Sequence, residues 1–257
     1  MPTVNHARRQ VHLKIVYYGP GLGGKTTNLE FIHQRTRPER RGKLISLMTE
    51  SERTLFFDLL PMDLGEFRGY AVRVHLCTVP GQIAHDATRQ LVLKHVDGVV
   101  FVVDSQEGRE DANITSIQNL HENLRLQGDD PDRIPLVVQY NKRDLPGALP
   151  AEVLQRQLSI PPAVPQLEAV ALTGEAVFET FKIIVKSCLA TVGDPADLDE
   201  GRSPPILPGR HSSEIPGAVP AAAGVRVARA PKVPRISRPP KLRPSTRPKL
   251  EPPSGEE

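Results

Sequence analysis

A glycine-rich run spans Gly19 to Thr26 and matches the pattern G-x-x-x-x-G-K-[ST]. Its glycines let backbone N–H groups converge on phosphate oxygens without obstruction by side chains. We expect the lysine to reach the β and γ phosphates and the threonine hydroxyl to meet Mg²⁺. The alternative is a glycine-rich turn that matches by chance. The candidate nucleotide-binding residues here are Gly19, Gly21, Gly23, Gly24, Lys25, Thr26 and Thr27.

A second candidate group, Asn141-Lys142-Arg143-Asp144, directly follows a strand-like segment. The Asp144 carboxylate can accept both the ring N–H and the exocyclic amine of guanine, whereas adenine would leave it unpaired. Asn141 can bridge the base and the phosphate loop, and the stem of Lys142 can cover the base plane. Because a charged loop after a strand is ordinary, this group alone is weak evidence, and its place after the phosphate loop makes it indicate guanine.

A third candidate group is Val79-Pro80-Gly81-Gln82. The backbone N–H of Gly81 can meet a γ-phosphate, and Gln82 can orient an attacking water. Without the other two groups it would be a common Pro-Gly turn.

The elements that must position these groups alternate between strand-like and helix-like segments. This alternation predicts an α/β fold with a doubly wound, mostly parallel sheet of six strands and helices on both faces. The glycine-rich run between the first strand and the first helix makes it a fold of the P-loop NTPase type. Ligands of such sheets bind beyond the carboxyl ends of the strands, and each group above follows a strand. The expected strands are 11–18, 43–48, 70–79, 98–104, 135–140 and 167–171, and the expected helices are 25–36, 84–96, 109–127 and 175–192.

The composition divides the chain into two parts. Residues 194–257 hold 14 of the 26 prolines, 11 basic and 8 acidic side chains, and no aromatic residue, so they carry the whole formal charge of +3. We expect residues 1–193 to form one folded domain with its own core and residues 194–257 to form a disordered tail rich in Pro, Arg and Lys.

The sequence was compared with the patterns of membrane spans, signal peptides and lipidation sites. The longest apolar run in the body, Val99 to Val103, is far shorter than a membrane helix requires. We find no signal peptide and no myristoylation or prenylation motif. The two cysteines have no metal or redox spacing. The sequence predicts a soluble cytoplasmic protein without a transmembrane segment or lipidation.

The three groups, in this order and spacing, resemble those of a Ras-like small GTPase. Their amino-acid sequences resemble those of the bacterial mutual-gliding (MglA-like) GTPases in particular. The resemblance covers about residues 10–192, which implies that the domain of residues 1–193 is a small GTPase domain, and it does not extend to the tail. It is carried by the segments Lys14–Leu22, Gly42–Leu47, Arg53–Asp58, Thr78–Gln82 and Gln139–Pro146.

The resemblance implies roles for further residues. Thr54 matches the switch threonine that senses the γ-phosphate and Mg²⁺, and Arg53 matches an arginine that acts as a built-in finger. Gln82 matches the glutamine that positions water, so Arg53 and Gln82 are the candidate catalytic residues and Thr26 and Thr54 the candidate metal ligands. Ala171 and Leu172 match the position of the last base-contacting loop of the family, but the usual Ser-Ala-Lys motif is not present there.

Thr78 is a departure from Ras-like proteins in general, which have aspartate at this position. A threonine can accept a hydrogen bond from a metal-bound water but adds no charge. Mg²⁺ would then depend more on Thr26, on the phosphates and on Asp58. The mutual-gliding family shares this threonine, so it does not by itself indicate an inactive enzyme.

The resemblance also implies a biological setting. We expect a GTP-binding switch that hydrolyses GTP to GDP and phosphate, slowly without help, in cell polarity or gliding motility. A roadblock-type activating partner, an exchange factor and effectors would act on it, and it would be recruited to a cell pole or the inner membrane surface. Two alternatives stay open: a module that holds GTP or GDP with little turnover and acts through its tail, and an ATP-using enzyme.

The tail has its own pattern. Nine basic residues and no acidic one lie between Val225 and Lys249, six of them at intervals of three. Polyproline II has three residues per turn, so these side chains would form one ridge. The ridge could bind a polyanion or an anionic membrane surface, but without aromatic residues it should not read a nucleic-acid sequence. An inert, solvated extension is the equal alternative.

Overall fold

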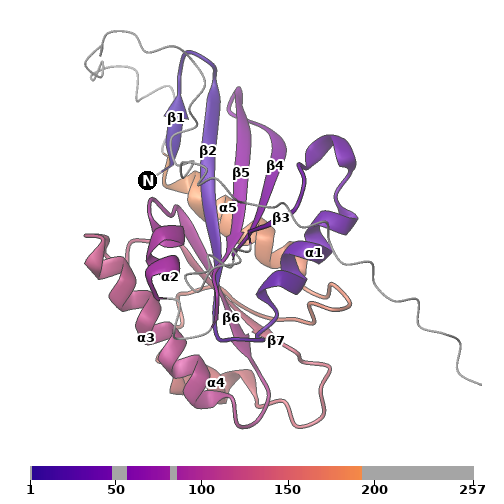
Figure 1. Cartoon of the computed structure of the whole chain (residues 1–257), viewed down its shortest axis with the longest axis vertical. Coiled ribbons are helices and arrows are strands. Elements are labelled where there is room, and N and C mark those ends of the chain that lie inside the picture. The colour runs from indigo at the N-terminus through magenta and orange to yellow at the C-terminus, as the bar shows by residue number, and fades with distance from the viewer. Residues whose placement is uncertain (1, 48–56, 82–85, 193–257) are drawn as a thin grey trace, which may run out of the picture. The chain divides into compact units, whose positions relative to one another are not determined.

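The computed structural model describes residues 2–47, 57–81 and 86–192 (Figure 1). Within them, short loops connect strands and helices that alternate for most of the chain. The strands are β1 (Thr3–Asn5), β2 (Gln10–Tyr18), β3 (Ile45–Leu47), β4 (Phe57–Phe67), β5 (Tyr70–Thr78), β6 (Gly98–Asp104), β7 (Leu136–Asn141) and β8 (Gln166–Glu168). The helices are α1 (Lys25–Arg35), α2 (Asp86–Leu93), α3 (Glu110–Leu126), α4 (Ala151–Gln157) and α5 (Val177–Ala190), with a 3-10 turn at Pro38–Arg40.

The strands form one mixed sheet in the order β3-β4-β5-β2-β6-β7-β8, with β1 beside β2. The pairs β2·β5, β2·β6, β6·β7 and β7·β8 are parallel, and the pairs involving β1, β3 and β4 with their neighbours are antiparallel. The α/β fold class is confirmed, but the expected count of six strands is wrong, because the described residues form eight. β1 and β4 are the two that the sequence did not indicate.

β4 escaped prediction because its sequence, FDLLPMDLGEF, contains a proline, a glycine and three acidic residues. Proline is tolerated on the edge of a sheet, where its missing N–H breaks no ladder bond. Within the described residues, β3 pairs with Phe57–Leu59, and the outer side of β4 beyond Leu59 has the isolated bridge from Arg41 to Met62. The antiparallel pairing of β4 with β5 decides its conformation.

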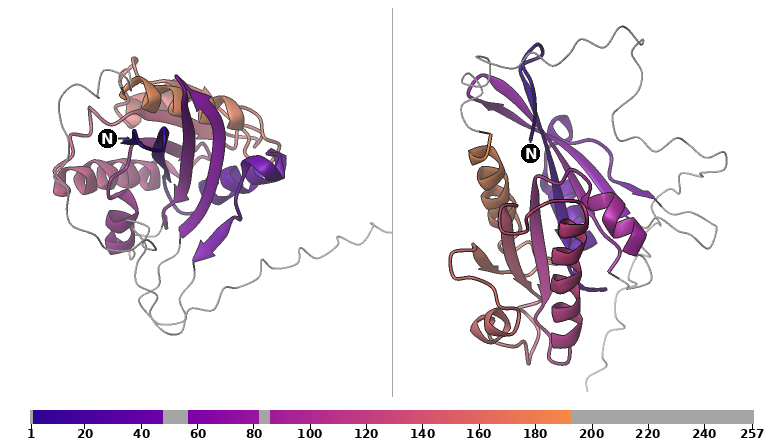
Figure 2. Two further views of the ribbon diagram at one scale, coloured as in Figure 1. Left: turned by 90° about the horizontal axis from the view of Figure 1, so that it is seen from above. Right: turned by 90° about the vertical axis from the view of Figure 1, so that its left-hand side faces the viewer.

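Helices cover both faces of the sheet (Figure 2). On one face, α1 and α5 pack on β2 through side chains such as Leu29, Ile32 and Phe181. On the other, α2, α3 and α4 pack through Val92, Leu120 and others. Every residue of β6 is buried, as expected for a valine-rich strand covered on both sides. None of the helices in the described part of the chain is long and apolar enough to cross a membrane.

The parallel strands place the loops that matter for function together. Since β2, β5, β6 and β7 run in one direction, their carboxyl ends lie at the same edge of the sheet. The loops after these four strands begin at Gly19, Val79, Ser105 and Lys142. Three of them carry the groups that the sequence singled out.

Candidate nucleotide-binding site

The phosphate loop connects β2 to α1 and requires glycine at two points. Gly19 has a φ of 144°, and a Cβ there would lie 2.2 Å from the carbonyl oxygen of Val102. Gly24, which caps α1, has a left-handed φ of 100°, and a Cβ there would lie 2.2 Å from Nδ2 of Asn141. Only glycine fits, and the loop delivers the positive end of the α1 dipole to the site.

Lys25 lies inside this loop. Its Nζ donates hydrogen bonds to the carbonyl oxygens of Gly19 at 2.8 Å and Pro20 at 2.6 Å. Burial, with the positive charge of Arg89 as a smaller cause, lowers the pKa of Lys25 to about 8. The ammonium is therefore poorly solvated, and the Asp58 carboxylate offsets the lowering of its pKa only in part, so a bound phosphate would add favourable negative charge.

Asp58 on β4 contacts Thr26, one of the two candidate metal ligands. Its Oδ2 accepts hydrogen bonds from Oγ1 of Thr26 at 2.7 Å and from Oγ1 of Thr78 at 2.9 Å. Ser46 Oγ donates to Oδ1 at 2.6 Å, and the Asp58 N–H donates to Thr78. The Asp58 side chain is buried, so a cation beside it would be strongly favoured.

The geometry gives a physical account of the threonine at position 78. Asp58 and Thr78 face each other across the antiparallel pair β4·β5, since Leu59 pairs with Cys77. A carboxylate therefore lies on β4, directly opposite the β5 position that holds threonine. These oxygens fit Mg²⁺, which prefers hard oxygen ligands and keeps several waters. No group of three or more His, Cys, Asp or Glu side chains in the described ranges is arranged for a metal, so the ion would rely on hydroxyls, one carboxylate, phosphates and water.

Asn141, at the end of β7, joins two loops. Its Nδ2 donates to the carbonyl oxygen of Gly23 at 2.8 Å, and its Oδ1 accepts the N–H of Ala171 at 2.9 Å. The buried amide therefore connects the phosphate loop to the loop after β8. Ala171 is brought into the site through its backbone, whereas the Leu172 side chain is 78% exposed.

Lys142 and Asp144 follow Asn141 and differ in their surroundings. Lys142 has a left-handed φ of 69°, and its Nζ donates to Asp104 Oδ2 and Gln106 Oε1, both at 2.8 Å. Asp144 is exposed on the same loop. An exposed carboxylate at this edge is available to a ligand.

A cavity of about 470 Å³ opens between the phosphate loop, β4 and the loop after β5, and the guanine group Asn141–Asp144 does not line it. Its wall includes Gly24, Lys25, Thr26, Thr27, Asp58, Thr78 and Gly81. Gly81 approaches the phosphate loop so closely that a Cβ there would lie 2.3 Å from the backbone nitrogen of Gly21. The volume is within the range of small-molecule sites. Arg53, Thr54 and Gln82 lie outside the described residues.

Sequence reasoning missed three residues beside the site: Ser46, Asp104 and Arg109. Asp104 had a usable signal, because it is a charged residue at the end of a fully buried strand. Ser46 and Arg109 had none, since each belongs to an otherwise ordinary polar segment.

Known proteins with similar sequences are small GTPases. Residues 70–197 match the model of the ADP-ribosylation factor (Arf) family. The chain is 54% identical over 189 residues to the mutual gliding-motility protein MglA of Myxococcus xanthus (strain DK1622), which covers 74% of this chain and 96% of that protein.

A solved structure also matches, the small GTPase Arl6 (BBS3) of Trypanosoma brucei with the bound nucleotide analogue GppNp. Its TM-score is 0.52 at 23% identity, covering 70% of this chain and 98% of that one, so this likeness concerns the fold alone.

The high identity across nearly the whole relative decides between the alternatives. Because the family consists of GTP hydrolases, neither alternative is favoured. These were a module that holds nucleotide with little turnover and an ATP-using enzyme. Its nucleotides are GTP and GDP, bound with Mg²⁺. The chain belongs to the MglA family of small Ras-like GTPases, which act as GTP-binding switches.

Proposed function

We propose that this GTPase binds its nucleotide in the cavity at the carboxyl edge of the sheet. The backbone from Gly21 to Thr27 and the Lys25 ammonium would hold the phosphates, and Asp144 would read the guanine edge. The observation that carries this assignment is the Asn141 side chain, which bonds to Gly23 and to Ala171 at once. One buried amide thereby fixes the phosphate-binding and base-binding loops at a set distance.

We further propose how the residues perform hydrolysis. Gln82 orients a water molecule for attack on the γ-phosphorus, and the Arg53 guanidinium offsets charge that develops on the phosphate oxygens. Lys25 neutralises charge on the β and γ phosphates. Thr26, Thr54 and Asp58 would hold Mg²⁺, which supplies Lewis-acid charge to the phosphates when bound.

Asp58→Asn should weaken Mg²⁺-dependent retention of nucleotide. The amide keeps the shape of the side chain but removes the buried charge beside Thr26 and Thr78. A charge-assisted interaction is worth about 1.5–3 kcal/mol, so the Mg²⁺ concentration for half-maximal retention should rise about 10- to 100-fold. The measurement is the release rate of a fluorescent GDP analogue across a Mg²⁺ titration.

Asp63→Asn is the matched control for that experiment. Asp63 lies on the same strand, but it does not line the cavity and forms an ion pair with Arg40. The double variant Asp58→Asn, Thr78→Asp should recover part of the Mg²⁺ dependence by returning a carboxylate to β5. An Asp58→Asn protein with the wild-type Mg²⁺ requirement would remove Asp58 from the metal site.

We propose a role in gliding motility or cell polarity, supported by the name of the relative from M. xanthus. The regulators would include a roadblock-type activating protein, an exchange factor and effectors, with recruitment to a cell pole or the inner membrane surface. If the arginine finger is Arg53 of this chain, the activating protein should act by positioning Arg53 and Gln82. It would then not need to insert an arginine of its own.

The tail, residues 194–257, lies outside the described residues, and we propose that it binds an anionic surface. Each basic residue near an anionic membrane adds about 1 kcal/mol, and the attraction falls off within a Debye length of about 8–10 Å. Truncation after about Asp194 should leave folding, GTP affinity and hydrolysis unchanged and remove a salt-sensitive association with polyanions.

Co-sedimentation with anionic liposomes across a salt series measures this difference. The full chain should sediment at low salt and dissociate as the salt concentration rises, and the truncated chain should stay in the supernatant. Equal, salt-independent behaviour of the two proteins would make the tail an inert extension.

A further inference from the structure

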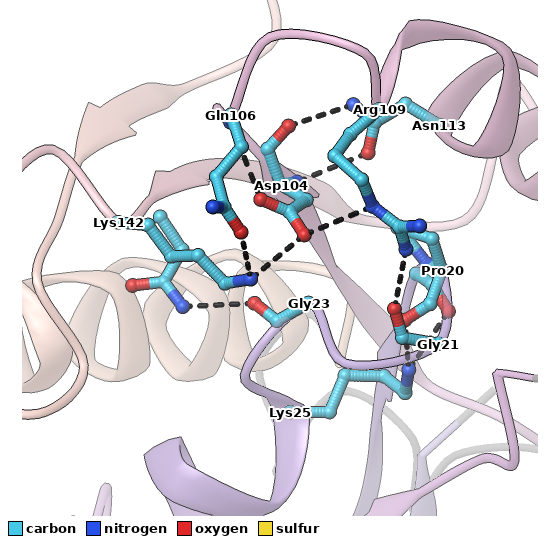
Figure 3. Close-up of polar contacts among 11 residues, drawn as sticks. Pro20, Gly21, Gly23, Lys25, Asp104, Gln106, Arg109, Asn113 and Lys142 are labelled. Atoms are coloured by element: carbon cyan, nitrogen blue, oxygen red, sulfur yellow. Dashed lines mark hydrogen bonds and ion pairs between the residues drawn. The ribbon is translucent and has the colours of Figure 1, made fainter. Parts of the chain in front are cut away.

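Arg109, immediately before α3, connects that helix to the phosphate loop. Its Nη2 donates to the carbonyl oxygen of Gly21 at 2.7 Å, and its Nε lies 3.3 Å from Asp104 Oδ2 (Figure 3). The backbone of Arg109 is itself held, because its N–H donates to Gln106 and its carbonyl accepts from Asn113. The guanidinium therefore reaches the loop from a fixed base.

Asp104 is an anchor shared by the phosphate loop and the guanine group. Its side chain is only 1% exposed, and its Oδ2 accepts from both Arg109 and Lys142. Asn113 holds the Asp104 backbone through two hydrogen bonds, which fixes the end of β6 (Figure 3). A buried carboxylate with two cationic partners resists displacement, because moving it would break both charge-assisted contacts at once.

The peptide between Gly21 and Leu22 is the part of the phosphate loop that Arg109 controls. In a trans peptide the C=O and N–H point in opposite directions, so holding the Gly21 carbonyl also fixes where the Leu22 N–H points. Leu22 has a left-handed φ of 64°, which is costly for a residue with a Cβ, and it lines the cavity. Such a conformation persists only where surrounding contacts enforce it.

We infer that Arg109 is a positioning residue for the phosphate loop: it fixes the Gly21–Leu22 peptide in the orientation that receives the nucleotide phosphates. This inference rests on the proposed nucleotide site. It gives the arginine at the start of α3 a role in nucleotide retention, reached through the loop backbone. Its side-chain contacts are with the phosphate loop and Asp104, and not with Asp58.

The test is the release of fluorescent GDP from full-length Arg109→Met, Arg109→Lys and wild-type protein in excess Mg²⁺. Arg109→Met keeps the length of the stem but loses both polar contacts, and release should accelerate about tenfold, the effect of one charged hydrogen bond. Arg109→Lys should fall between the two, because one ammonium replaces a fork that contacts two acceptors. Arg125, an exposed arginine on α3, provides the matched control: Arg125→Gln should release GDP like the wild type.

A second readout separates positioning from general loosening. The ratio of IDP to GDP release rates reports recognition of the 2-amino group of the base, which we assign to Asp144. It should be unchanged in Arg109→Met, because the contacts of Arg109 are to Gly21 and Asp104 and not to Asp144. Arg109→Met release within twofold of the wild-type rate, or a shifted ratio, would overturn the inference. If Arg109→Met does not fold, Arg109→Lys decides, and a wild-type rate there would overturn it. A wild-type protein that does not bind GDP would instead refute the proposed site.

Discussion

Arg53→Ala should remove most of the activator-stimulated GTP hydrolysis while GTP binding stays near normal. An arginine finger contributes roughly 10³–10⁵ in rate, or about 4–7 kcal/mol of barrier, through charge that appears only in the transition state. Because Arg53 must be placed correctly against the phosphate, unstimulated hydrolysis should be slow even in the wild type. Gln82→Ala should have the same phenotype through loss of water orientation. Single-turnover hydrolysis with and without activator measures both variants.

Arg37→Ala is the control for this experiment, because Arg37 is exposed and lies outside the cavity wall. Its stimulated rate should equal that of the wild type. A stimulated rate that survives Arg53→Ala would show that the arginine comes from the activating protein or is not used. Equal loss of GTP affinity would instead assign Arg53 to ground-state binding.

Asp144→Asn should weaken GTP and relax specificity toward xanthine nucleotides. The carboxylate accepts from two donors on the guanine edge, whereas the amide presents a donor that matches the 2-oxo group of xanthine. Losing this charge-assisted pair should cost about 2–4 kcal/mol of GTP binding. Competition of GTP, XTP and ATP against a fluorescent nucleotide measures the change.

Asp132→Asn, in the exposed loop before β7 at the opposite end of that strand, should leave all three affinities unaltered. Asp144 is not the reader of the base if its asparagine variant binds GTP and XTP as the wild type does.

Site residues that are close together in the sequence could be predicted from it, whereas contacts between distant segments could not. The phosphate loop and the Asn141 group are contiguous, so their chemistry could be assigned from residue types and spacing. The Asp58–Thr78 pair depends on the register of β4 against β5, across 20 residues, and the proline and glycine of β4 concealed that strand. Thr78 could therefore be recognised as a departure, while the compensating contacts of Asp58 required the structure.

Other contacts depend on backbone atoms, which residue types do not report. Ala171 joins the site through its N–H, and Gly21 accepts from Arg109 through its carbonyl. The Arg109–Gly21 contact spans 88 residues and combines an ordinary arginine with a glycine expected only to bind phosphate. The short helix α4, at seven residues, offers too few turns for its periodicity to stand out.

Single-turnover hydrolysis of GTP, with ATP as the competing nucleotide, tests the central claim most directly. The protein with Mg²⁺ should convert bound GTP to GDP and phosphate slowly, and a roadblock-type activating protein should accelerate it by orders of magnitude, with no effect of excess ATP. GTP that stays intact with the activator present, or displacement of GTP by ATP, would contradict the account of this chain as a guanine-specific hydrolytic switch.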